Sequence, residues 1–129
     1  MAEEIKRQLN LNIPLDIPVS QLGAGEKQLV EIMRAIYSKP RLLILDEPTA
    51  SLGEGEIEPF LDFVRAIKRT MNLSVIFISH KIQEVFSISD EIAVLTDGRL
   101  MLQKPAAEVT QEQCISAMLR NGSLKPVHI

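Results

Sequence analysis

Two adjacent carboxylates, Asp46 and Glu47, follow directly on the aliphatic run 42–45. Pro48 then interrupts the chain, so the run is short and bounded, as expected of a buried strand. In open α/β sheets, ligands bind beyond the carboxyl ends of the strands. Neighbouring strand residues point to opposite sides, so the two carboxylates are expected to have different tasks. One can face Mg²⁺, which prefers oxygen ligands and keeps several waters, while the other faces a nucleophilic water.

Two further features could complete a phosphoryl-transfer site, which needs a metal, a water-orienting group and donors for the phosphate oxygens. His80 follows a second apolar run. Gly23, Ala24 and Gly25 precede a helical pattern, where small residues let backbone N–H groups approach a phosphate and the helix dipole favours the anion. Taken singly, each feature also fits a role without ligand: a loop-capping aspartate, a solvated glutamate, a glycine turn or a packed histidine.

The elements that must position these residues alternate along the chain. Strands buried on both faces are expected from the continuous apolar runs, the first of them Arg41–Asp46. The last helix is expected to turn Cys114, Ile115, Met118 and Leu119 inward. The alternation predicts an α/β fold with a mainly parallel sheet and flanking helices. Helices are predicted over Ala2–Leu11, Gly25–Tyr37, Ile57–Met71, Lys81–Ser87 and Glu112–Arg120, and strands over Arg41–Asp46, Leu73–Ser79, Glu91–Thr96 and, after a Thr-Asp-Gly-Arg turn, from Arg99 on.

Composition narrows the class of protein. Its 129 residues are 46% hydrophobic, enough for one domain, and its 17 acidic against 14 basic residues give a net charge of −3. That balance argues against binding nucleic acid or an anionic membrane through bulk charge. The single cysteine, Cys114, excludes an internal disulfide. No apolar run approaches the ~18 residues of a membrane span, so we expect a soluble intracellular chain.

In this order, the motifs resemble those of the second half of an ATP-binding cassette (ABC) ATPase, the nucleotide-binding domain of ABC transporters. LGAGEKQ resembles the signature motif LSGGQxQ, and LLILDEP resembles the Walker B strand with its catalytic glutamate. ASLG stands at the position of the D-loop, and FISHK resembles the switch-histidine segment. The resemblance covers roughly residues 15 to 105. Within the family it is nearest to the first cassette of the tandem ATPases that drive monosaccharide import.

The resemblance implies a role for each matching residue. Asp46 would hold Mg²⁺ through its water shell, Glu47 would be the general base, and His80 would contact the terminal phosphate of ATP. Sites in this family form between two cassettes arranged head to tail. The residues that would close over ATP held by the opposing cassette are Gly23, Ala24, Gly25, Glu26 and Gln28 of the signature segment, and Ser51, Leu52 and Gly53 of the D-loop segment.

Two positions depart from the family pattern. Gly23 replaces the signature serine, which removes a hydroxyl donor to the terminal phosphate and costs about 1–3 kcal/mol if no water replaces it. Gly53 replaces the D-loop aspartate and weakens communication across the dimer. The two composite sites of such a dimer are therefore expected to be unequal.

A third departure is larger: no G-x-x-x-x-G-K-[ST] phosphate loop occurs in the sequence. We therefore expect a fragment lacking the phosphate-loop strand and inactive alone, with residues 1–122 forming the C-terminal part of one ABC ATPase domain. Within it, residues 1–38 would end the helical subdomain and carry the signature helix, 39–122 would form part of the core sheet, and 123–129 a linker or tail. In the family that the sequence resembles, the phosphate-loop strand lies between the strands ending at Ser79 and Thr96, so these would lack a common neighbour. They could pair directly, take a neighbour from a second chain or aggregate through exposed edges, and we expect an edge-paired or swapped dimer.

The function implied is ATP binding and hydrolysis by a subunit of an ABC transporter, with a sugar as the expected cargo. Expected partners are a second ABC cassette, membrane permease subunits and, indirectly, a periplasmic or extracellular solute-binding protein, with no nucleic acid. The expected location is the cytoplasmic face of the membrane. Two alternatives stay open: a fragment of an SMC-like chromosome or DNA-repair ATPase, whose signature also resembles LSGGEK, and a degenerate cassette acting only as a regulatory module.

Overall fold

The computed structural model describes residues 16, 18–119 and 127–128, so the helix predicted over Ala2–Leu11 lies outside the described residues. The chain forms two compact units, one of Met1–Leu43 and Thr49–Val75, the other of Ile44–Pro48 and Ile76–Ile129. None of the described helices is long and apolar enough to cross a lipid bilayer.

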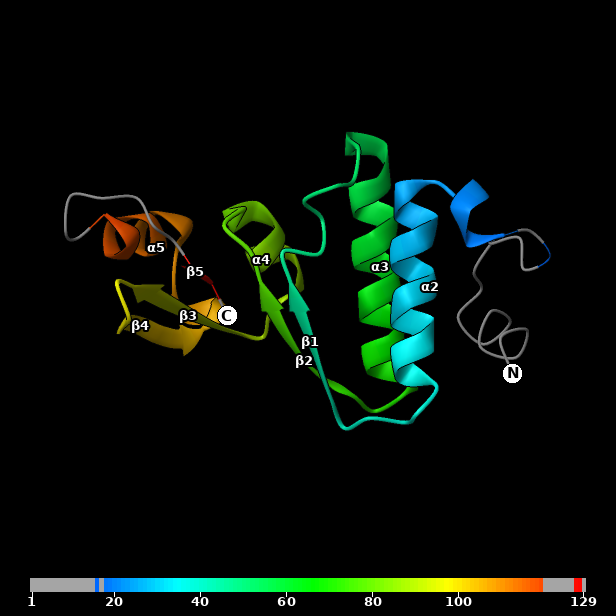
Figure 1. The fold of residues 1–129 in the computed structure, drawn as a ribbon. Coiled ribbons are helices and arrows are strands. Elements are labelled where there is room, and N and C mark those ends of the chain that lie inside the picture. The colour runs from blue at the N-terminus through cyan, green and yellow to red at the C-terminus, as the bar shows by residue number, and fades with distance from the viewer. Residues whose placement is uncertain (1–15, 17, 120–126, 129) are drawn as a thin grey trace. The chain divides into compact units, whose positions relative to one another are not determined.

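The elements are the 3₁₀ helices η1 (Val19–Gln21) and η2 (Ala106–Glu108), the helices α2 (Ala24–Ile36), α3 (Glu54–Thr70), α4 (Ile82–Ile88) and α5 (Gln111–Met118), and the strands β1 (Leu42–Asp46), β2 (Ser74–Ile78), β3 (Glu91–Thr96), β4 (Arg99–Pro105) and β5 (Val127–His128) (Figure 1).

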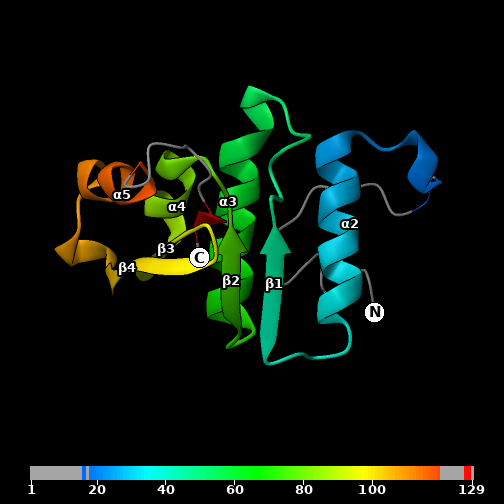
Figure 2. The ribbon, with the colours of Figure 1, turned by 60° about the vertical axis from the view of Figure 1, so that its left-hand side comes forward.

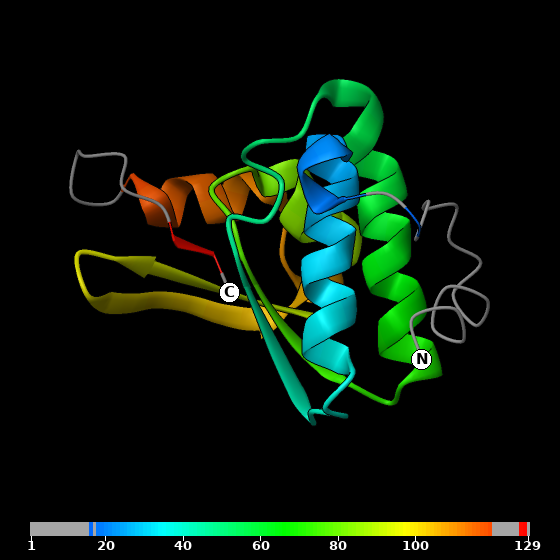
Figure 3. The same cartoon turned by 45° about the vertical axis from the view of Figure 1, so that its right-hand side comes forward.

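Helices α2 and α3 pack side by side in the first unit, and both begin at the same end of the pair (Figures 1 and 3). Each buries one stripe, because its apolar residues recur at helical spacing. On α2 the stripe contains Ile32, Met33 and Ile36, and on α3 Leu61 and Val64 are completely buried. The predicted amphipathic helices are thus confirmed, and their starts lie next to each other.

Strands β1 and β2 form a two-stranded sheet and run in the same direction (Figure 2). Near their beginnings the Ser74 N–H donates to the Arg41 carbonyl (3.1 Å), and at their ends the Glu47 N–H donates to the Ile78 carbonyl (2.8 Å). The carboxyl ends of both strands therefore lie at the same edge, as the α/β prediction requires.

The prediction that the first strand is buried on both faces is wrong. Leu43 and Leu45 are buried, but Leu42 is 48% and Ile44 57% exposed. Alternate residues of a strand point to opposite faces. The described residues therefore cover one face of β1 and leave the Leu42 and Ile44 face open to solvent.

In the second unit, β3 and β4 form an antiparallel hairpin in which Thr96 pairs with Arg99. The two residues between them, Asp97 and Gly98, have φ values of 51° and 77°. Positive φ at both central positions is what a type I′ turn requires, and Asp-Gly suits it because glycine has no Cβ to clash there. The predicted turn is confirmed.

The pairing of β3 excludes one outcome considered for the strand ending at Thr96, direct pairing with the strand ending at Ser79. Within the described residues, β3 pairs with β4 and with β5, and β2 pairs with β1, so β2 and β3 do not pair directly. Leu95 of β3 lies opposite Val127 of β5, in antiparallel register. Two residues of the predicted tail thus add a strand to β3.

Helix α5 packs against β3 and β4. Cys114 and Met118, one turn apart, are buried, and burial raises the pKa of the Cys114 thiol. The prediction that Ile115 and Leu119 also point inward is wrong, since they are 40% and 46% exposed. A helix of eight residues buries only a narrow stripe, here Cys114 and Met118, and Ile115 lies outside it. Leu119 comes after the last residue of the helix.

The packing of α3 predicts a large difference between two leucine truncations in the first unit. Leu61→Ala should lower the free energy of unfolding by about 2–5 kcal/mol, because it leaves a cavity in a fully buried site. Leu42→Ala removes the same atoms from a half-exposed site and should cost less than half as much. Chemical denaturation followed by circular dichroism would measure both, and equal costs would contradict the packing described.

Candidate functional site

Glu47 occupies an unusual backbone position. It follows the last residue of β1 and has a φ of 50°, in the left-handed region that side chains other than glycine seldom adopt. Its N–H nevertheless still pairs with the Ile78 carbonyl of β2. The chain therefore turns away from the sheet at Glu47 while staying bonded to it. A strained backbone conformation persists only where contacts with the surrounding structure hold it in place, and such conformations are concentrated at functional sites.

The side chains of Glu47 and His80 meet at the ends of the two strands. His80 Nδ1 lies 3.0 Å from Glu47 Oε1. The two side chains are 35% and 57% exposed, so the pair contributes little to stability. The other carboxylate oxygen, Oε2, is buried and has no hydrogen-bond partner among the described residues. Leaving such an atom unpaired costs about 1–3 kcal/mol, which indicates that a ligand or water is its natural partner.

Ser79 anchors His80 from the preceding position. It is completely buried, and its Oγ accepts a hydrogen bond from the Lys81 N–H (3.0 Å). Lys81 precedes α4 and lies 3.7 Å from the carboxylate of Glu84. His80 is thus held between a buried serine and the start of a helix, while its imidazole points outward.

Asp46, the last residue of β1, is exposed. Within the part of the chain that the structure describes, no group of three or more His, Cys, Asp or Glu side chains could hold a metal ion. Mg²⁺ does not require one, because it is commonly bound by one or two carboxylates together with waters and substrate phosphates. Asp46, exposed at the end of β1, fits that requirement.

The signature segment begins α2. Gly23 caps the helix with an extended backbone, and its N–H donates to Oε1 of Glu26 (3.0 Å). Because glycine has no side chain, only this half of a capping box exists. Ala24 and Gly25 lie in the first turn, and Gln28 follows one turn later, half-buried. The Glu26 carboxylate is therefore engaged by its own helix.

Sequence reasoning missed Glu56, whose Oε2 accepts a hydrogen bond from the Gly25 N–H (2.8 Å). Its Oε1 accepts a second from the Gly53 N–H (3.3 Å), at the start of α3. The spacing Gly53-x-x-Glu56 is a capping-box signal and could have identified the second contact. No local pattern identifies the first, which joins residues 31 positions apart.

The D-loop segment leads into α3. Ser51 and Gly53 are exposed. Leu52 is buried in the core of the first unit, with 9% exposure, and its N–H donates to the Thr49 carbonyl (3.1 Å). The side chain of Leu52 is therefore a packing group, and Ser51 and Gly53 are the members of the segment open to a ligand.

The predicted residues form two groups. The second unit brings Glu47 and His80 together and holds Asp46 beside Glu47. The first unit contains the signature and D-loop segments, which Glu56 links through their backbones. The first group has the groups for activating a water near a metal-bound phosphate, and the second has backbone donors suited to anionic oxygens.

Comparison with known proteins assigns this arrangement to a class. A chain of a metal-chelate type ABC transporter, solved in an inward-facing conformation, matches with a TM-score of 0.80 and 24% identity, covering 92% of this chain and 48% of that one. The fold is therefore α/β and P-loop NTPase-like. The model of the ABC transporter family matches residues 1–50.

Sequence relatives specify the family. The xylose import ATP-binding protein XylG of Yersinia pseudotuberculosis is 45% identical over 112 residues, which are 87% of this chain and 22% of the relative. The galactose/methyl galactoside import ATP-binding protein MglA of Treponema denticola is 38% identical over 118 residues, 92% of this chain and 24% of the relative. These relatives and the family model together support an ABC transporter ATP-binding domain. The chain spans less than a quarter of the length of these relatives.

The left-handed backbone of Glu47 can be tested with a matched pair of variants. Glu47→Ala and Glu47→Gly both remove the contact with His80, but only glycine relieves the positive φ. The glycine variant should be more stable than the alanine variant by about 0.5–1 kcal/mol, because relief of strain exceeds the extra entropy of unfolded glycine. Denaturant unfolding of both gives the difference, and a more stable alanine variant would show that φ is not positive there.

Proposed function

We propose that the chain is the water-activating part of an ATP-binding and ATP-hydrolysing subunit of an ABC transporter, and that the transporter imports a sugar. The single observation that carries the chemistry is Glu47, with one oxygen on His80 and the other buried and unpaired. The names of the relatives, import proteins for xylose and for galactose, support a sugar as cargo.

In this proposal, Glu47 is the general base or water-positioning group. A water donating to its free Oε2 would be oriented for attack on the terminal phosphate of ATP, and the carboxylate would take up the proton. His80 fixes the carboxylate through Oε1. Its exposed imidazole is free to contact the terminal phosphate and to respond to its loss.

Asp46 is the proposed Mg²⁺ residue, acting through the water shell of the ion. When bound, Mg²⁺ neutralises charge on the phosphates of ATP. Asp46 is exposed at the end of β1, and Glu47 leaves the strand in the next position. The two carboxylates can therefore serve a metal and a water without competing for one ligand.

The remaining phosphate-binding groups have to come from sequence outside these 129 residues, since no G-x-x-x-x-G-K-[ST] loop occurs within them. That loop supplies the lysine and the backbone N–H groups that hold the β- and γ-phosphates. We therefore expect the 129 residues alone to release no phosphate from ATP.

The signature and D-loop segments are proposed to act on ATP held by a second cassette. Gly23, Ala24, Ser51 and Gly53 are exposed residues, which supports this role. Membrane permease subunits and, through them, a solute-binding protein would be the further partners. With those partners, the protein would lie at the cytoplasmic face of a membrane.

Glu47→Gln in the full-length protein tests the catalytic role. The amide cannot accept a proton, so turnover of ATP should fall by about 10²–10⁴-fold, while nucleotide binding persists. Steady-state phosphate release and nucleotide binding would be measured on the same preparation. Unchanged turnover would favour the second candidate, a regulatory cassette without catalysis, which Gly23 and Gly53 in place of the family's serine and aspartate would support.

Gly23→Ser tests the weakened signature. A Cβ at position 23 would meet nothing closer than Glu26 Oε1, at an ordinary 3.6 Å. The serine hydroxyl could donate to a phosphate and also accept from a helix N–H, which adds a few tenths of a kcal/mol to stability. Nucleotide-dependent closure of the cassette pair should become tighter. Gly55→Ser, a substitution at an open position of α3, is the control, and equal effects of both would contradict the assignment.

A further inference from the structure

One carboxylate joins two segments that the sequence separates. Glu56 Oε2 accepts from the Gly25 N–H of the signature segment (2.8 Å), and Oε1 accepts from the Gly53 N–H of the D-loop segment (3.3 Å). All three residues lie in the first unit. Each oxygen therefore holds one backbone donor, and the two donors belong to different helix starts.

Helix polarity explains why a carboxylate is suited to this place. α2 and α3 begin at the same end of their pair (Figure 1), so the positive ends of both helix dipoles lie together. A negative group between them interacts favourably with both, and hydrogen bonds to an ionised acceptor are stronger than neutral ones. Glu56, the third residue of α3, is within reach of both ends.

Gly25 makes the contact possible. A Cβ built on Gly25 would collide with Oε2 of Glu56 and would lie 3.2 Å from its Cδ. The carboxylate thus occupies the space that any other side chain at position 25 would fill. A residue larger than glycine would displace the flexible end of Glu56 and break the bond without disturbing the buried face of either helix.

We infer that Glu56 is a positioning residue for the ATPase reaction. It fixes the signature segment, Gly23–Gln28, to the D-loop segment, Ser51–Gly53, so that both present their backbones to the opposing ATP as one rigid piece. The inference rests on the proposed function, which gives both segments the same ligand. Glu56 is itself exposed, so its role lies in the relative placement of the two segments.

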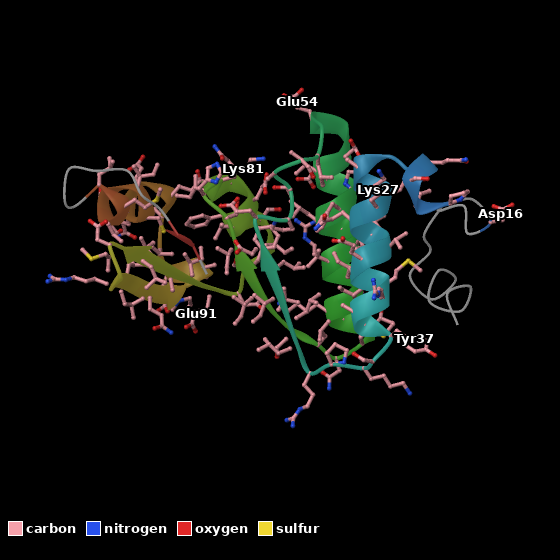
Figure 4. The ribbon with its side chains drawn as sticks, viewed as in Figure 1. Asp16, Lys27, Tyr37, Glu54, Lys81 and Glu91 are labelled. Carbon is pink, nitrogen blue, oxygen red and sulfur yellow. The ribbon has the colours of Figure 1, made fainter. Side chains whose placement is uncertain are left out.

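The link that Glu56 forms between the Gly25 and Gly53 amides, called the tie below, is tested first without nucleotide. The measurement is amide hydrogen exchange in the full chain, followed by NMR. Glu56→Ala should speed exchange at Gly25 and Gly53 by about fivefold, the effect of losing one hydrogen bond. Glu54→Ala removes a neighbouring first-turn carboxylate that points away from the helix pair (Figure 4), and it should leave both amides unchanged. Gly25→Ala should speed exchange at position 25 equally, and the double variant should exchange no faster than either single variant. Additive effects would overturn the tie.

The second arm measures ATP hydrolysis by the full-length protein assembled with its partners. Glu56→Ala and Gly25→Ala should each lower kcat, leave KM for ATP near its original value, and show no further loss in combination, because ATP first binds the opposing cassette. Glu54→Ala should match the wild type. Unchanged kcat in Glu56→Ala would overturn the positioning role. A wild-type protein without ATPase activity would instead overturn the proposed function, while the exchange measurement still decides whether the tie exists.

Discussion

The hydrogen bond from the Glu47 N–H to the Ile78 carbonyl is the constraint on which the Glu47–His80 site depends. It closes the parallel β1–β2 pair at its carboxyl end, which places His80, two residues after Ile78, beside a glutamate 33 positions earlier in the sequence. A shift of one residue in this register would turn the side chains of one strand to the opposite face. The left-handed backbone of Glu47 follows from the same bond, since the residue must leave the strand and remain paired to it.

The other half of the molecule depends on helix polarity. Two helices that begin side by side bring their positive ends together, and the chain supplies first-turn carboxylates there: Glu26 on α2, and Glu54 and Glu56 on α3. Two of them bind backbone N–H groups, at Gly23, Gly25 and Gly53. These amides thus donate to anionic oxygens, in line with the behaviour of helix N-termini generally.

Local patterns predicted the elements well, because helical spacing and apolar runs depend on neighbours in the sequence. The helices α2 and α3, the strand pair β1 and β2, and the Asp-Gly turn all follow from such patterns, as does the placement of Glu47 and His80 at neighbouring strand ends. Contacts between distant residues could not be predicted this way. Nothing in the sequence around Leu42 shows that one face of β1 is open to solvent, and nothing around Gly25 indicates Glu56. The pairing of Val127–His128 with β3 could not be predicted from the sequence either, because a strand of two residues is too short to show a periodic pattern.

Gly23 and Gly53 occupy equivalent positions at the starts of two helices, where glycine has little effect on the stability of the fold. Both are N-caps, and each donates its N–H to a glutamate three residues later, Glu26 or Glu56. Glycine at an N-cap is only a few tenths of a kcal/mol worse than serine or aspartate, and the glutamates retain the other half of each capping box. The fold therefore tolerates both departures from the family pattern almost without cost. Any effect of these two glycines on function is then expected in the proposed contacts with ATP and a second cassette, where the family's hydroxyl and carboxylate would act.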